Sequence, residues 1–534
     1  LRKLTEAAVT TRSGRLGNTA HMFFTMIRMC SAQQIVFLLQ VTRPSLTEYA
    51  TRRLDIAIAN AVFEITNTIK FLPPKESEEM RTVLIRLQTR IRLGGIGIQK
   101  TEEVREAAYI SSIVMAGPTL KHYFPDIDKR NDPVWETLNM KEFHHTIQEL
   151  KARGIEALQE DDVLIDNMWT ENTEKLQRKI MGEVQKMNQT NLRKALPNGE
   201  ALGGFARVAL NKCDLAIRSQ GLVNEDHDAN PWLLSTGKNG LNQVAFDRAI
   251  ANRLLLDSRG SRRHCLCGEE LDILCEHAMN CGVTHAIAQR TRLHNQVQDV
   301  VEKHWYKIAD SAGYDVIPGH PKLKKGPRVS DFMEPRQNAA RSNAPEEAYA
   351  DMGLVHRESG LTYLIDFTTT SPITGPMCWQ NFEPGDKANI AEGDKKKKYL
   401  ARHHPDELVV IVPLAIETTG SYGKTTKTHI EMMADLTAQK ADGDDSEKSR
   451  SYQLRQLKTK ISVSLQGMKA KIINNFLKIH ALDTRPTFPL ANNVPLVDFP
   501  VPPLPRYTGR SANENRRFAL TPLPDRQVVD YRLQ

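Results

Sequence analysis

The chain has 534 residues and 40% of them are hydrophobic, enough for several domains that each bury an apolar core. No run approaches about 18 uninterrupted apolar residues, and the start lacks a basic segment followed by an apolar one, so we expect neither a membrane span nor a secretory signal. The net charge of +8 comes with basic clusters at 81–92, 322–328 and 395–398. Such clusters suit a polyanionic partner, although any one of them is equally consistent with a solvated face.

The first part of the chain is predicted to be helical. The run Ser45–Glu48, after Pro44, matches a capping box, and apolar residues follow at helical spacing. A second helix is expected over about 76–92, after the Pro73-Pro74 break. The chain begins at Leu rather than Met, which indicates a piece of a longer product or a cleaved one.

Three glycines in four residues, at 94, 95 and 97, require a tight or left-handed backbone. No strand pattern precedes them and no Lys-Ser/Thr pair follows, so we interpret this segment as a structural turn rather than a phosphate-binding loop. Residues 99–256 continue as a mostly helical region without a catalytic motif.

An α/β pattern follows in the second half. An amphipathic helix is predicted over 286–308, strands over 347–355, 361–368 and 408–416, and a helix over about 385–402.

The last part of the chain combines one long helix with polar or Pro-rich segments. We expect 436–450 to be a loop, because it is polar and acidic. The apolar stripe over 454–479 recurs near a heptad spacing and is interpreted as a core-facing helix rather than a coiled coil. From about 483 the chain is Pro-rich and lacks apolar periodicity, which predicts a disordered tail.

Four metal-binding side chains lie close together in the sequence at Cys265, Cys267, His277 and Cys281. Seven unevenly placed cysteines do not suggest a disulfide framework, and two short segments that each carry a ligand pair match a tetrahedral zinc site. Cys275 and His264 are spare donors. All four positions are filled, so the predicted zinc is structural; the alternative is a pair of buried cysteines near a surface histidine.

Two aspartates fall on consecutive predicted strands, Asp351 and Asp366, with a turn at Ser359-Gly360 between them. A hairpin with one carboxylate on each strand can bring both acids to one Mg²⁺, which activates a water and polarises a phosphate. Lys395 and Lys398 lie one turn apart on the next helix, so both are expected to face the same pocket. The alternative is an ordinary pair of strand-end aspartates with a solvated lysine run.

The order of these motifs resembles the C-terminal half of non-LTR retrotransposon polyproteins that carry a restriction-like endonuclease. The matching positions are Leu93–Ile98 (the turn after the polymerase thumb), Cys265–Gly268, Leu271-Asp272, His277-Ala278 and Cys281 (the zinc knuckle), Arg290, Arg292, His294-Asn295, Val297 and Asp299 (the helix after it), Ala350-Asp351, Ile365-Asp366 and Ser371-Pro372 (the nuclease hairpin), Lys395 and Lys398-Tyr399 (the lysine helix), and Val412-Pro413 and Glu417–Gly420 (the strand beyond).

The resemblance implies a multidomain protein with a mostly α-helical N-terminal half and an α/β nuclease similar to the PD-(D/E)xK fold. The expected divisions are a thumb-like helical region (1–92), a helical linker region (93–256), a zinc knuckle (262–285), a restriction-like endonuclease domain (286–435), a C-terminal helix (450–482) and the disordered tail (483–534). No Phe/Tyr-x-Asp-Asp polymerase signature is present in this context, so the palm of the RNA-directed DNA polymerase is expected to be absent from this chain.

By the same resemblance, the nuclease nicks target DNA so that the exposed 3′ end primes reverse transcription of the element RNA in the nucleus. Asp351 and Asp366 are then the magnesium ligands, and Lys395 or Lys398 is the catalytic lysine. Two other hypotheses stay open: a zinc-containing nucleic-acid-binding module with an inactive nuclease fold, and a structural interaction protein that uses the 454–479 helix.

Overall fold

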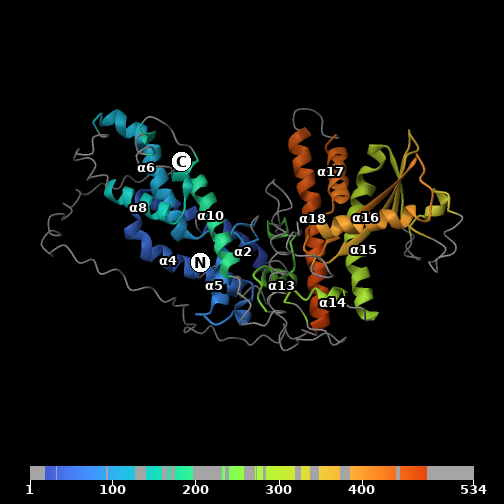
Figure 1. Cartoon of the computed structure of the whole chain (residues 1–534), viewed down its shortest axis with the longest axis horizontal. Helices are drawn as coiled ribbons and strands as arrows, with labels where there is room; N and C mark the ends of the chain where they lie inside the picture. The colour runs from blue at the N-terminus through green and yellow to red at the C-terminus, as the bar shows by residue number, and fades with distance from the viewer. Residues whose placement is uncertain are drawn as a thin grey trace, which may run out of the picture. The chain divides into compact units, whose positions relative to one another are not determined.

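The chain is mostly helical, and its C-terminal part contains one small mixed sheet (Figure 1). The described residues of this computed structural model are 6, 19–31, 33–91, 94–126, 140–158, 164, 167–169, 175–195, 231–234, 240–257, 271, 273–280, 284–318, 326–336, 348–372, 385–439 and 446–477. They all belong to one compact unit, Leu1–Leu496. The predicted Pro-rich tail lies outside them.

The first half is built from helices that bury two apolar cores. These helices are α2 (Thr19–Cys30), α3 (Gln33–Val41), α4 (Pro44–Ile65), α5 (Glu78–Gln88), α6 (Thr101–Tyr123), α8 (Met140–Ala152), α10 (Leu176–Ala195), α12 (Pro231–Leu234) and α13 (Gln243–Arg253), with 3₁₀ turns at Ile69–Phe71 and Glu156–Leu158. The helices predicted from apolar spacing in this part are therefore present.

The predicted capping box at the start of α4 is wrong. The helix begins at Pro44, its N-cap residue is Arg43, and no side chain caps it. Instead, the backbone N–H of Ser45 donates to the carboxylate of Glu142 at 3.0 Å, and Glu48 pairs with Arg52. Proline at the first helical position favours the helical φ, and this local preference moved the helix start ahead of the serine.

The glycine turn is confirmed. Gly94 and Gly97 have φ values of +90° and +81°, in the left-handed region. A Cβ at Gly95 would lie 2.0 Å from the carbonyl oxygen of Thr89, so only glycine fits there. The turn folds back onto the end of α5, where the N–H of Ile96 donates to the carbonyl of Arg86 at 2.9 Å.

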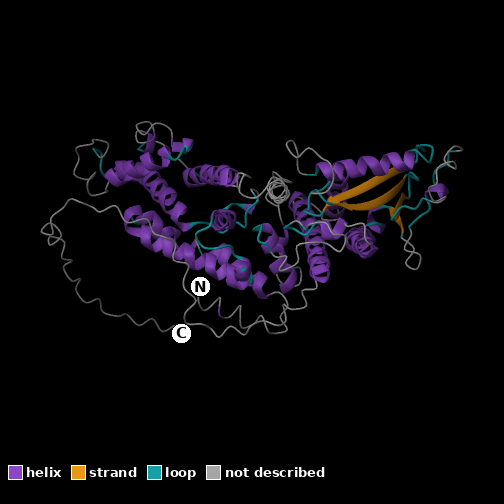
Figure 2. Ribbon diagram, turned by 60° about the horizontal axis from the view of Figure 1, so that its bottom comes forward, coloured by secondary structure: helices purple, strands orange, loops and turns teal. Residues whose placement is uncertain are grey.

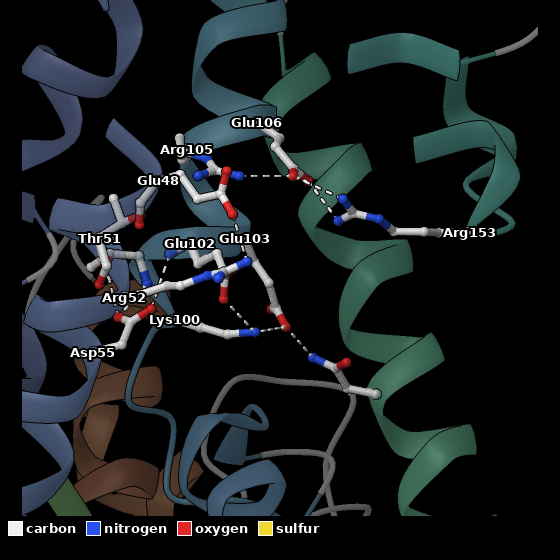
Figure 3. Close-up of polar contacts among 12 residues, drawn as sticks. Glu48, Thr51, Arg52, Asp55, Lys100, Glu102, Glu103, Arg105, Glu106 and Arg153 are labelled. Atoms are coloured by element: carbon white, nitrogen blue, oxygen red, sulfur yellow. Dashed lines mark hydrogen bonds and ion pairs between the residues drawn. The ribbon is translucent and has the colours of Figure 1, made fainter. Parts of the chain in front are cut away.

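The start of α6 is capped by a side chain from α4 (Figure 3). Asp55 accepts hydrogen bonds from the N–H and hydroxyl of Thr101 at 2.7 and 2.8 Å and from the N–H of Glu102 at 3.1 Å. Burial raises the pKa of Asp55 to about 6, and these donors act against that rise. The contacts connect α4 to α6, two helices that have α5 and the glycine turn between them in the sequence.

One stretch, Ala20–Val41, is long and apolar enough to cross a membrane by length and composition alone. It is divided between two helices, since α2 ends at Cys30 and α3 begins at Gln33. The same test is passed by core helices and signal sequences, so this is weak evidence for a membrane segment.

The sheet contains β1 (Tyr314–Ile317), β2 (Met352–His356), β3 (Thr362–Thr370) and β4 (Val409–Glu417), in that spatial order. β1, β2 and β3 pair antiparallel, whereas β3 and β4 are parallel. A parallel pair needs a crossover, and α16 (Asp386–Leu400) supplies it. The predicted strands and the helix between them are present within a few residues of their expected bounds.

The sheet lies between helices (Figure 2). On one face, alternate residues such as Ile365 and Phe367 join a core with α15 (Thr284–Ile308), α17 (Lys424–Ala438) and α18 (Ser446–Leu477). On the other face, Leu364 packs with Tyr399 of α16. Side chains alternate across a strand, so Asp366 shares the α16 face with Leu364.

The stripe predicted over 454–479 is a core-facing helix. Leu457, Ile461 and Leu465 of α18 are buried in the same core as β3 and β4. α18 begins at Ser446, so the segment predicted to be a loop, 436–450, holds the end of α17 and the start of α18.

Candidate active site

The hairpin of β2 and β3 brings the two predicted aspartates together. The register pairs Met352 with Ile365, so the preceding residue, Asp351, lies opposite Asp366. Residues directly opposite each other in an antiparallel pair are close neighbours, and the side chains of Asp351 and Asp366 share a hydrogen bond. The turn between β2 and β3 lies at Ser359-Gly360, as predicted. Gly360 adopts a φ of +69° in this turn.

Asp366 is held by one face of α16. Lys395 Nζ donates to Oδ1 and Oδ2 of Asp366 at 2.7 and 2.8 Å. One turn further, Tyr399 Oη donates to Asp366 Oδ2 at 2.6 Å. Asp366 itself is 5% exposed, so its charge is compensated within the protein rather than by bulk water.

Asp351 is held by backbone and by α15. The N–H of Phe367 donates to Asp351 Oδ2 at 2.7 Å, and His294 Nε2 lies 3.4 Å from the same oxygen. Gln298, one turn after His294, donates to the backbone carbonyl of Asp351 at 3.4 Å. α15 therefore presents a polar face to the hairpin, beside the apolar stripe that enters the core.

The surroundings of the two carboxyl groups shift their pKa values in opposite directions, upward for Asp366 and downward for Asp351. Burial raises the pKa of Asp366, and the neighbouring charge of Asp351 adds to this rise against the opposing effect of Lys395. Burial also acts to raise the pKa of Asp351, but His294, the N–H of Phe367 and a hydrogen bond with Asp366 together bring it below its ordinary value. Two adjacent acids commonly divide in this way, because both cannot carry charge without a cation between them.

The two predicted lysines differ in where their side chains point. Lys395 contacts Asp366, whereas the side chain of Lys398 is exposed. Within the described part of the chain, Lys398 forms no hydrogen bond or ion pair with either aspartate. The expectation that both lysines face one pocket is therefore wrong, because residues three apart on a helix differ by about 60° in direction. Tyr399, four residues after Lys395, shares its face instead.

His294 and Tyr399 are site residues that the sequence reasoning did not assign. Both had appeared only as members of family-like motifs. The signal that could have found Tyr399 is its spacing of four from Lys395. For His294 the signal is the spacing of four to Gln298, beside an apolar stripe that includes Val297 and Val301.

The donor set at this site suits a hard divalent cation. Lys395 Nζ also lies 3.4 Å from the carbonyl oxygen of Phe367. The ammonium group of Lys395 is therefore surrounded by this carbonyl oxygen and the carboxylate oxygens of Asp366. Oxygen ligands of this kind are those that Mg²⁺ prefers, with water completing its coordination. Over the described residues, no group of three or more His, Cys, Asp or Glu side chains is arranged to hold a metal, so an ion here would depend on two carboxylates.

The predicted zinc ligands are only partly described. Cys265, Cys267 and Cys281 lie outside the described residues. His277 is half-buried at the start of α14 (His277–Asn280). Cys275, a spare donor in the sequence interpretation, is a buried thiol packed with Leu271, Ala278 and Ile473.

Comparison with known proteins does not identify a family. No protein-family model matches the sequence, and no curated protein matches it.

Proposed function

We propose that this chain is the nuclease-bearing C-terminal portion of a non-LTR retrotransposon polyprotein, and that it nicks DNA by metal-dependent phosphodiester hydrolysis. The observation that carries this proposal is the convergence of Asp351, Asp366 and Lys395 where the start of β2 lies beside the middle of β3. The element order α15-β1-β2-β3-α16-β4 supports the expected restriction-like fold. In this proposal the polymerase palm belongs to another part of the polyprotein.

Asp351 and Asp366 would hold a Mg²⁺ ion, and the carbonyl oxygen of Phe367 is a third oxygen within reach of the same cluster. When bound, such an ion activates a water and polarises the scissile phosphate. Lys395 holds a positive charge beside Asp366, where it offsets the negative charge that develops on the phosphate.

The other residues of the site orient these groups. Tyr399 fixes Oδ2 of Asp366 through its hydroxyl. His294 favours the ionised form of Asp351, which a cation ligand requires. The N–H of Phe367 fixes the orientation of the same carboxylate.

The rest of the proposal follows the family resemblance. Cys265, Cys267, His277 and Cys281 would bind a structural zinc ion, for which thiolate and imidazole are suitable donors. Target DNA and element RNA would be the partners, and the nucleus the place of action. Nicking would leave a 3′ end that primes reverse transcription.

The test is nicking of supercoiled plasmid by the full chain with Mg²⁺. We expect conversion to the open circle by the wild type, and none with EDTA or with Asp351→Asn or Asp366→Asn. Each variant removes one charge while keeping side-chain size, so thermal melting should show a folded protein. Equal nicking by the wild type and both variants would exclude this site.

A second candidate is a nucleic-acid-binding module with an inactive nuclease fold. The observation that favours it is the double contact of Lys395 with Asp366, because the ammonium group already compensates this carboxylate. This candidate predicts salt-dependent DNA binding without cleavage at any Mg²⁺ concentration. The plasmid assay therefore separates the two candidates.

A further inference from the structure

A short segment, residues 326–336, connects the two elements that carry the candidate active site; we call it the strap. The strap begins beside residues 348–350, which directly precede Asp351, and pairs with them antiparallel. Two backbone hydrogen bonds of 2.9 and 3.0 Å form this pairing, from the N–H of Val329 to the carbonyl of Ala348 and from the N–H of Ala350 to the carbonyl of Pro327. The strap therefore fixes the backbone that leads into Asp351.

The far end of the strap is attached to the chain just after α16. The N–H of Arg336 donates to the carbonyl of Arg402, and the N–H of His404 donates to the carbonyl of Glu334, both at 2.8 Å. α16 carries Lys395 and Tyr399, which both contact Asp366. The strap is thus bonded to the backbone on the Asp351 side of the site and on the Asp366 side.

The middle of the strap packs against Tyr399. Val329 and Met333 are 0% and 2% exposed, and they share a small apolar core with the ring of Tyr399. The hydroxyl of Tyr399 lies 2.6 Å from Asp366 Oδ2 and 3.0 Å from the carbonyl oxygen of Tyr349, within the segment that pairs with the strap. A shift of the strap would therefore change how Asp366 is held.

The start of the strap touches the backbone of Asp351 itself. A Cβ at Gly326 would lie 1.8 Å from the carbonyl oxygen of Ala350 and 2.7 Å from the carbonyl carbon and oxygen of Asp351. Only glycine allows this approach, because any side chain would force the two backbones apart. Gln298 of α15 donates to the same carbonyl oxygen of Asp351 at 3.4 Å, so α15 and the strap both contact this residue.

We propose that the strap positions the metal site. Gly326 sets the backbone of Asp351 and Val329 sets the ring of Tyr399, so that the carboxylates of Asp351 and Asp366 meet at one divalent cation. Mg²⁺ demands near-ideal ligand geometry, so a small displacement of either carboxylate weakens its binding. This inference rests on the proposed function, in which the two aspartates hold the ion. Gly326 and Val329 are positioning residues, because they act through Asp351 and Tyr399.

The experiment is titration of the full chain with Mn²⁺ by isothermal titration calorimetry, beside thermal melting in EDTA. For Gly326→Ala we expect the Kd of Mn²⁺ to rise by about 10-fold, the effect typical of a lost partner behind a metal ligand. The matched control is Gly182→Ala on α10, the same substitution at a place where a Cβ meets nothing within 4 Å. Its Kd should equal that of the wild type.

A second pair of variants tests the middle of the strap and decides the question if Gly326→Ala does not fold. Val329→Ala and Val104→Ala remove the same methyl groups from side chains that are 0% and 1% exposed, the latter in the core of the helical half. Both should lower the melting temperature. Only Val329→Ala should also raise the Kd of Mn²⁺, by about 3-fold, since its contact with Tyr399 is apolar and less direct than a hydrogen bond.

The outcomes separate this inference from the proposed function. A wild type that binds no Mn²⁺ would overturn both. Binding by the wild type with the same Kd in Gly326→Ala and Gly182→Ala would overturn the inference alone. Lower melting temperatures with an unchanged Kd in the strap variants would likewise overturn it, because the strap would then contribute to stability only.

Discussion

At the residue scale, the site is defined by which donors reach each carboxylate. Lys395 and Tyr399 both bind Asp366, while His294 and the N–H of Phe367 bind Asp351. The sequence could predict the aspartate pair because strand alternation and a two-strand hairpin require no distant information. It could not choose between the lysines, because the choice depends on which face of α16 packs against the hairpin. For His294 the sequence offered a spacing signal but not its contact with Asp351, which depends on the packing of α15.

Replacement of Lys395 should separate it from Lys398. In Lys395→Met we expect single-turnover nicking to fall by about 100-fold or more, because a positive charge next to the reacting phosphate is lost. Lys398→Met should nick at close to the wild-type rate at saturating DNA, since its side chain is exposed. Equal losses in the two variants would contradict the assignment of Lys395.

Replacement of His294 should change the pH dependence of nicking. Burial acts to raise the pKa of Asp351 and His294 opposes this, so His294→Ala should raise that pKa. The fall in rate on acidification should then begin at higher pH, and more Mg²⁺ should be needed for half-maximal rate. Asn295→Ala, an exposed neighbour on α15, is the control, and an identical pH–rate profile for the two variants would exclude a role of His294.

At the element scale, buried carboxylates at helix starts connect α16 and α17 to the sheet and to each other. Glu417, at the end of β4, accepts from the N–H of Lys387 in the first turn of α16 at 3.2 Å. Glu392 of α16 in turn accepts from the N–H groups of Thr425 and Thr426, both at 2.9 Å, at the start of α17. Local sequence patterns do not reveal caps of this kind, because the acceptor belongs to another element, as the failed prediction at Ser45–Glu48 also demonstrates.

Glu417 should make stability fall as pH rises through neutrality. Burial raises its pKa to about 7, above the ordinary value of 4.5, so the folded state binds a proton more tightly than the unfolded state does. This contribution is fully present below about pH 4.5 and is lost as pH rises through about 7. Between about pH 6 and 8 the loss should be about 1 kcal/mol in denaturant titrations, and Glu417→Gln should flatten it. An unchanged slope in that variant would contradict the assignment.

Removal of the Asp55 cap should destabilise the helical half. Asp55→Ala leaves the first N–H groups of α6 without their acceptor, and we expect a loss of about 1 kcal/mol in the free energy of unfolding. Urea titration followed by circular dichroism measures this. The control is Glu407→Ala, at an exposed loop position, which should change the free energy by less than about 0.5 kcal/mol. Equal values for the two variants would show that the cap contributes nothing.

At the scale of the whole molecule, the sequence predicted a mostly helical chain with a small α/β part, and the structure agrees. Apolar periodicity carries this information because each helix and strand must bury one face. The packing of α18 into the same core as the sheet could not be read from the sequence, since its apolar stripe fits any apolar partner. The pairing of the strap with residues 348–350 and 402–404 was likewise visible only in the folded chain.

The central claim is that Asp351 and Asp366 share one divalent cation next to Lys395. Titration of the protein with Mn²⁺, followed by electron paramagnetic resonance of the free ion, tests this claim most directly because it measures the ion itself. We expect one bound Mn²⁺ that Mg²⁺ displaces, and its loss in both Asp351→Asn and Asp366→Asn. Mn²⁺ binding that is the same in the wild type and in both variants would contradict the claim.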